Sequence, residues 1–238
     1  MAQINIPTNV FLVILGLLPS IVWLLIFLTK DSRPEPKYLI VKVFLFGIVI
    51  APVVVMLEAA ASSIFRGVVS SAVAFFTLAA FIEEYMKYWV VRHSVVAKPD
   101  FDEPHDSIIY MIAAALGFAA MENILIAFKI YPEGFAATFG IIALRFTGAT
   151  LLHALASGIV GYFLGLAWFF YHFKKQIVAF GLILASFLHL IFNYLIFIDP
   201  SAALPGNTVL LLGMMVSLLI LFDRLKQRHK QLIQSVST

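Results

Sequence analysis

The sequence predicts an all-α fold, a polytopic membrane bundle of about seven transmembrane helices. Its composition is the first reason: 62% of the 238 residues are hydrophobic and 12% are charged, against roughly 25% charged in a typical soluble domain. Its patterning is the second. Apolar runs recur along the chain, and their lengths are close to that of a membrane-spanning helix, about 20 residues. The connections between them are too short for a second domain. We therefore expect residues 1–238 to form a single integral membrane domain.

The apolar runs define the expected helices in order. They are Val10–Thr29, Tyr38–Leu57, Val68–Val91, Ser107–Phe128, Thr147–Tyr171, Ile177–Ile198 and Thr208–Phe222. A further stretch, Phe135–Phe146, is too short to cross alone. It is expected to be a re-entrant or interfacial piece, or an extension of the fifth helix. Proline, glycine and charged residues gather between the runs, as is typical of turns.

Lysine and arginine are distributed unevenly over the loops. Most lie in alternate connections and in the segment after Phe222, whereas the opposite loops carry only Arg66 and Lys129. By the positive-inside rule this bias places the N-terminus outside and the C-terminus in the cytoplasm. The net charge of +3 then has a topological explanation, and no nucleic-acid partner is expected; the lipid bilayer is the expected surrounding.

Ionisable and amide side chains inside the expected helices are the informative residues. A charged group near the bilayer centre costs about 2.5–3.5 kcal/mol on insertion scales, so such groups are usually paired, hydrated or functional. The set comprises Glu83, Glu84, Lys87, Glu122, Asn123, Arg145, His153, His189 and Asn193. Each alone has a structural interpretation: Glu83 and Lys87 are spaced for an ion pair, and Arg145 can be a counter-ion. Together, carboxylates and imidazoles on four helices can activate water and stabilise an oxyanion.

The sequence does not support several known classes of intramembrane protease site. There is no H-E-x-x-H zinc motif, and the aspartates lie in loops or at boundaries. The absence of cysteine excludes a thiol nucleophile. Ala156-Ser157-Gly158 is a weak match to a rhomboid-type serine site, because Leu155 stands where that motif has glycine. A glutamate-based site remains.

Three motifs occur in order on separate expected helices: Glu83-Glu84-Tyr85-Met86-Lys87 (E-E-x-x-K), Phe118 to Glu122 (F-x-x-x-E), and His189 to Asn193 (H-x-x-x-[DN]). Together with His153 and the loop Phe101–Asp106, they resemble the PrsW family of intramembrane proteases and, more distantly, the type II CAAX prenyl endopeptidases. The resemblance covers about residues 81–195, with catalytic helices at roughly 68–198. Asn193 stands where PrsW proteins often have aspartate.

The resemblance implies an endopeptidase that cleaves a membrane-anchored protein substrate, such as an anti-sigma factor, in a bacterial or archaeal cell membrane. It implies that Glu83 or Glu84 acts as general base on a water molecule, assisted by His153. His189 with Asn193 would stabilise the oxyanion, and Glu122 would be a second acid or a metal ligand. Lys87 and Arg145 would form structural ion pairs.

The cofactor stays open at this point. The family is often described as metalloproteases, and Glu122, His153 and His189 would make a three-ligand site for a divalent ion such as Zn²⁺ with a position left for water. We favour a metal-free site, because no two of these ligands have a helical spacing that would pre-form half of the site.

Two other functions use the same residues. A proton- or cation-coupled transporter commonly relies on intramembrane carboxylates and histidines, although the chain lacks the internal repeat that many transporters show. A non-enzymatic scaffold would use the polar cluster only to hold helices together.

Overall fold

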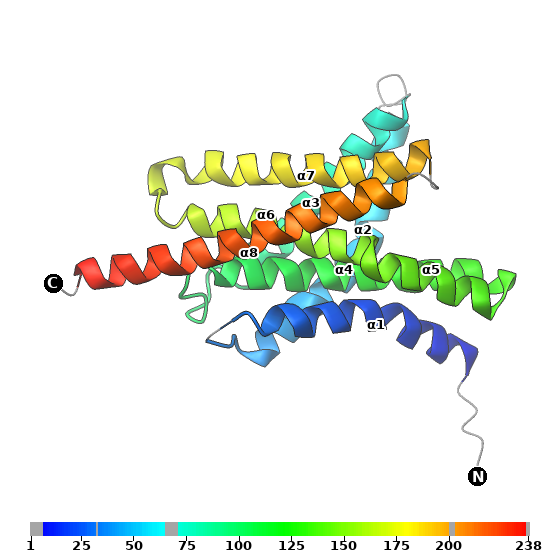
Figure 1. The fold of residues 1–238 in the computed structure, drawn as a ribbon, viewed down its shortest axis with the longest axis horizontal. Helices are drawn as coiled ribbons and strands as arrows, with labels where there is room; N and C mark the ends of the chain where they lie inside the picture. Colours follow the sequence, from blue (N-terminus) through cyan, green and yellow to red (C-terminus); the bar gives the residue numbers. More distant parts are fainter. Residues whose placement is uncertain (1–6, 32, 65–70, 200–202, 237–238) are drawn as a thin grey trace, which may run out of the picture.

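The structure is a computed structural model that describes residues 7–31, 33–64, 71–199 and 203–236. Within these residues the chain forms eight α-helices and two 3-10 turns, Tyr131–Glu133 and Tyr171–Phe173, and no strand (Figure 1). The helices are α1 (Thr8–Leu28), α2 (Lys37–Ile64), α3 (Ala72–Ser94), α4 (Asp106–Ile130), α5 (Phe135–Thr147), α6 (Ala149–Leu166), α7 (Lys174–Ile198) and α8 (Ala203–Val236). The predicted all-α membrane bundle is confirmed.

Six segments of the described chain are long and apolar enough to cross a membrane, and α5 with α6 counts as one of them. α3 is not among the six, although it is 23 residues long. Its sequence carries Glu83, Glu84, Lys87 and Arg92, which lowers its hydropathy. α3 corresponds to the predicted helix Val68–Val91, which carries most of the charged residues predicted inside the membrane.

The stretch 135–146 is an extension of the fifth predicted helix. It forms α5, and only Gly148 separates α5 from α6. Gly148 has φ −101° and ψ −100°, outside the helical region, so the helix breaks there and its direction can change. This break lies between Arg145 and His153, two residues of the predicted site.

The last helix is longer than its hydrophobic run. It was predicted to end at Phe222, but α8 continues to Val236. The added turns carry lysine, arginine and glutamine, which are good helix formers. The segment after Phe222 is thus a helical extension of the bundle and not an irregular tail.

α4 lies at the centre of the bundle, in contact with α1, α2, α3, α5 and α6 (Figure 1). Every residue from Asp106 to Ala120 is buried, as expected of a helix that is apolar on all sides. The outer helices instead expose large apolar side chains, among them Leu25, Val49, Ile183 and Leu212. Such a surface is suited to contact with lipid.

Two glycines allow α2 and α4 to approach very closely. A Cβ atom on Gly117 would lie 1.9 Å from the carbonyl oxygen of Phe44, and one on Gly47 would lie 2.1 Å from that of Ala114. Small residues at a helix crossing permit this backbone contact in membranes. The crossing helps to fix α4, which carries Glu122.

Gly117→Leu is therefore expected to destabilise the bundle by at least about 1–3 kcal/mol, because the clash is with backbone and cannot be relieved by a rotamer change. Thermal unfolding in detergent measures the effect. Gly140→Leu is the matched control, since a Cβ at Gly140 meets nothing within 4 Å. Equal melting temperatures for the two variants would contradict the proposed close crossing.

Candidate active site

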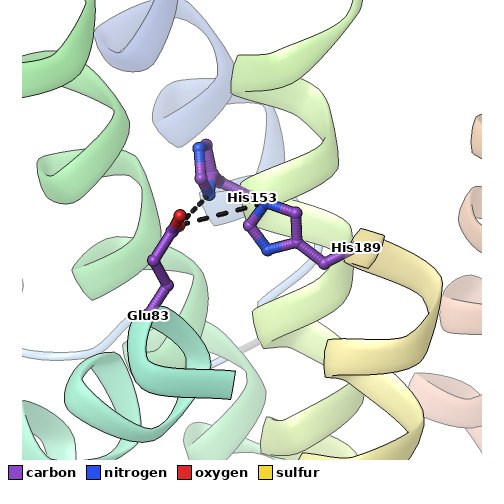
Figure 2. Close-up of side chains that lie close together, drawn as sticks. All are labelled: Glu83, His153 and His189. Atoms are coloured by element: carbon purple, nitrogen blue, oxygen red, sulfur yellow. Dashed lines mark ion pairs between the residues drawn. The ribbon is translucent and has the colours of Figure 1, made fainter. Parts of the chain in front are cut away.

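The polar residues predicted inside the membrane, Asn193 excepted, form one connected cluster. Hydrogen bonds and ion pairs join side chains from α3, α4, α5, α6 and α7, which are distant in sequence. Figure 2 shows its centre, where Glu83 of α3 points toward His153 of α6 and His189 of α7. The cluster brings together Glu83, Glu84, Lys87, Glu122, Asn123, Arg145, His153 and His189.

Lys87 is the cation at the middle of the cluster. Its Nζ lies 2.8 Å from Glu84 Oε1, 3.2 Å from Glu83 Oε2 and 2.9 Å from His153 Nδ1. The ammonium also lies 4.5 Å from the centre of the Phe118 ring, a cation–π contact. Lys87 and Glu84 are fully buried, so their charges can persist only because they are paired.

The contacts of His153 define its hydrogen positions. Lys87 has only donors, so we assign His153 Nδ1 as the acceptor of the Lys87 hydrogen bond. The hydrogen of the ring is then on Nε2, which donates to Glu122 Oε2 at 2.9 Å. His153 Nδ1 therefore presents a lone pair toward Lys87 and Glu83, whose Oε2 is 3.7 Å away.

His189 has the complementary arrangement. Its Nδ1 lies 3.1 Å from Glu84 Oε1, and because an ionised carboxylate only accepts, Nδ1 carries the hydrogen. The lone pair of His189 is then on Nε2, which lies 3.9 Å from Glu83 Oε2. The rings of His153 and His189 stand nearly perpendicular, with centroids 5.0 Å apart.

Glu83 and Glu84 have different surroundings although they are neighbours in sequence. Glu84 is fully engaged: Lys87 and His189 contact Oε1, and the Ser157 hydroxyl donates to Oε2 at 2.6 Å. Glu83 contacts the cluster through Oε2. Its Oε1 has no hydrogen-bond partner among the residues that the structure describes. Of the two, Glu83 has the carboxylate oxygen available for another molecule.

The residues fit a divalent metal ion, in a set that differs from the predicted one. Glu83, His153 and His189 each offer a ligand atom, and these atoms lie within 4.8 Å of one another. Each imidazole donates its other N–H to a carboxylate, as metal-bound histidines usually do. Glu122, predicted as the third ligand, instead lies on the Nε2 side of His153. Binding through His153 Nδ1 requires Lys87 to release that nitrogen.

Glu122 and Arg145 form the outer part of the cluster. Arg145 donates to Glu122 Oε2 at 2.9 Å and to Asn123 Oδ1 at 2.6 Å. Asn123 in turn donates to the Thr150 hydroxyl at 3.0 Å. Arg145 thus has the expected counter-ion contact, and through Glu122 it helps to hold His153 in place.

Asn193 is one turn from His189 on α7 and is half-buried. Among the described residues it has no hydrogen bond to the cluster, so the structure does not join it to the other site residues.

Two residues that the sequence did not indicate belong to this region. Thr150 bonds to Asn123, and Glu58 of α2 interacts electrostatically with Glu83 and Glu122. No spacing pattern relates either residue to the motifs.

Comparison with known proteins gives the family. A family model described as PrsW family intramembrane metalloprotease matches residues 35–221. Protease PrsW of Oceanobacillus iheyensis is 30% identical over 219 residues, 92% of this chain and 96% of the relative. Protease PrsW of Geobacillus kaustophilus is 31% identical, with 76% and 77% of the two chains covered. Protease PrsW of Bacillus subtilis is also 31% identical, with 65% and 67% covered.

No solved structure matches the chain. The family match covers most of the sequence and includes all the helices that supply the cluster. It does not favour a transporter that would use the same carboxylates and histidines. The chain belongs to the PrsW family and is an intramembrane protease.

Proposed function

We propose that this protein hydrolyses a peptide bond of a membrane-anchored protein with a water molecule activated beside Glu83, His153 and His189. The observation that carries the proposal is the convergence of Glu83 Oε2 and two imidazole lone pairs on one buried point. Such groups can position and deprotonate a water molecule. Water is scarce among membrane-spanning helices, and the polar cluster provides a place for it.

Glu83 is the proposed general base. Its Oε1 accepts a proton from the attacking water, and the same carboxyl then delivers that proton to the leaving amine nitrogen. Glu84 acts through His189, whose ring it orients, and Glu122 does the same for His153. This assignment chooses Glu83 over Glu84 as the base because both oxygens of Glu84 are already occupied.

The oxyanion of the tetrahedral intermediate is placed beside α7. Asn193 lies one turn from His189, and its amide has the hydrogen-bonding capacity to donate to the developing charge. A protonated His189 would add a second donor through Nε2.

A divalent ion such as Zn²⁺ would be held by Glu83, His153 and His189. It would supply Lewis acidity and lower the pKa of the water. The family description as metalloproteases supports this extension of the proposal.

The substrate is proposed to be a single-pass membrane protein, and an anti-sigma factor in a bacterial membrane is the specific candidate. The named relatives come from bacteria. The distribution of lysine and arginine supports an outside N-terminus and a cytoplasmic C-terminus. Nucleic acid has no part in the proposal.

His189→Ala tests the proposal. It is expected to abolish cleavage of a single-pass reporter co-expressed in the same membranes, and the purified variant should bind about one equivalent of Zn²⁺ less than the unsubstituted chain, because one of three ligands is lost. The measurements are immunoblotting of the reporter and elemental analysis of dialysed protein.

His172→Ala is the matched control, since His172 is an exposed imidazole in the 3-10 turn between α6 and α7 and has no contact with the cluster among the described residues. Cleavage by His189→Ala at the normal rate, with normal insertion, would refute the proposed site. Normal cleavage without bound metal and in the presence of chelator would refute the metal extension alone.

A further inference from the structure

A second buried polar cluster lies at the start of α4, away from the active site. It comprises Glu103, His105 and Asp106, in and after the loop that joins α3 to α4. Asp106 and Glu122 are 16 residues apart on the same helix, which is about 24 Å at 1.5 Å per residue. The two clusters are therefore separate, and catalysis as proposed above does not use this one.

The three residues present ligand atoms to one another. One atom from each lies within 4.8 Å of the others, and all three residues are buried. His105 Nε2 is 3.1 Å from Glu103 Oε2, but neither ring nitrogen has hydrogen-bond geometry to a partner among the described residues. An imidazole that is 97% buried is thus left without a hydrogen bond, which is costly unless another group satisfies it.

The two carboxyl oxygens of Asp106 have different surroundings. Oδ2 accepts the backbone N–H groups of Glu103 at 2.7 Å and Asp102 at 3.1 Å, which fixes the loop. Oδ1 is buried and has no hydrogen-bond partner in the described chain. It is therefore an interior oxygen with the capacity to bind a ligand, in the same cluster as the unsatisfied imidazole.

Further buried carboxyl groups surround the cluster. Asp31 and Glu35, from the connection between α1 and α2, interact electrostatically with the cluster, and both are buried. Arg33 forms an ion pair with Glu103 at 3.1 Å, but its own side chain is 74% exposed. Lys226 and His229 of α8 also face His105 electrostatically. Among the described residues these four buried carboxyl groups thus share one ion-paired arginine, and a bound cation would stabilise their ionised forms.

We propose that Glu103, His105 and Asp106 form a second, structural site for a divalent transition-metal ion. Two carboxylates and one imidazole are ligands that suit Zn²⁺ or Mn²⁺ better than Ca²⁺, which takes oxygen ligands.

The ion would join three parts of the fold. Glu103 is tied to the α1–α2 connection through Arg33, Asp106 begins α4, and the His105 ring packs edge-on against Phe222 of α8 with centroids 5.3 Å apart. Binding at this point would fix the start of α4 against both neighbours.

The test uses the purified full chain in detergent and Zn²⁺ alone as the probe. After dialysis against Zn²⁺, the unsubstituted chain and the control His172→Gln should each bind about one equivalent more than His105→Gln, because an imidazole ligand is lost. Zn²⁺ should also raise the melting temperature less for His105→Gln than for His172→Gln. Glu103→Gln is the second ligand variant and should behave like His105→Gln, while its amide oxygen can keep the Arg33 contact.

The active-site variant separates the two metals. In the His189→Ala background, adding His105→Gln should remove a further equivalent. Equal Zn²⁺ content and equal melting shifts for His172→Gln, His105→Gln and Glu103→Gln would overturn the second site. So would a single equivalent in the unsubstituted chain that His189→Ala alone removes.

Discussion

Glu83→Gln is expected to lower kcat/KM for a membrane-anchored reporter by about 10³-fold or more, since removal of a general base typically costs 10²–10⁴-fold. The glutamine keeps the shape of the side chain, so Lys87 can still contact its amide oxygen. It cannot take a proton from water, and it presents no second carboxylate oxygen. Initial rates of reporter cleavage by purified protein in proteoliposomes give the comparison.

Glu84→Gln is the informative partner of this variant. Glu84 contacts Lys87, His189 and Ser157 and has no free oxygen, so its loss should act through the position of His189 and cost about 10–100-fold. Glu133→Gln, an exposed glutamate in the turn after α4, should be neutral. A Glu84→Gln variant less active than Glu83→Gln would reverse the assignment of the base.

The sequence predicted the membrane bundle, and most of the polar residues that it singled out lie together in one cluster. Apolar runs separated by proline and charge predict helices because a bilayer leaves the backbone few alternatives. Among the described residues the motifs on α3, α4 and α7 select side chains that do meet, Asn193 excepted, since charged groups in lipid must find partners. α3, which is not among the six most apolar segments, was still predicted as a helix from the run Val68–Val91, and its Glu83, Glu84 and Lys87 marked it as part of the site.

The contacts between the site residues could not be predicted from the sequence. Glu83 and Glu84 are neighbours in sequence. Only the positions of α6 and α7 determine that Ser157 and His189 hydrogen-bond to Glu84, whereas Glu83 keeps one carboxylate oxygen without a partner among the described residues. Glu122 was grouped with the histidines as a ligand, but it contacts the far nitrogen of His153. Such differences depend on helix rotation by a fraction of a turn, which motif spacing does not specify.

The loop before α4 shows the same limit in another form. In the sequence, the loop Phe101–Asp106 is distinguished only by its resemblance to the corresponding stretch of the PrsW family. Its buried state depends on packing against α8 and on the connection between α1 and α2. A polar loop in sequence is normally solvated, so nothing local predicts that His105 lacks a hydrogen bond.

Lys87→Met is expected to destabilise the folded bundle by about 3–5 kcal/mol, the usual effect of breaking a buried ion pair from one side. Methionine fills a similar volume and can keep contact with Phe118. It leaves Glu83 and Glu84 facing each other and the two imidazoles without a cation at the centre. Unfolding in a detergent titration measures the change, with Lys129→Met, an exposed residue at the end of α4, as a control expected within about 0.5 kcal/mol of the unsubstituted chain.

The double variant Lys87→Met/Glu84→Gln separates electrostatics from packing. If the cost comes from an uncompensated carboxylate, removing the Glu84 charge should recover part of the stability, and the two substitutions should be strongly non-additive. Purely additive losses would mean that Lys87 contributes mainly by packing. That result would also weaken the proposed site, in which Lys87 is the cation that pairs with the Glu83 carboxylate.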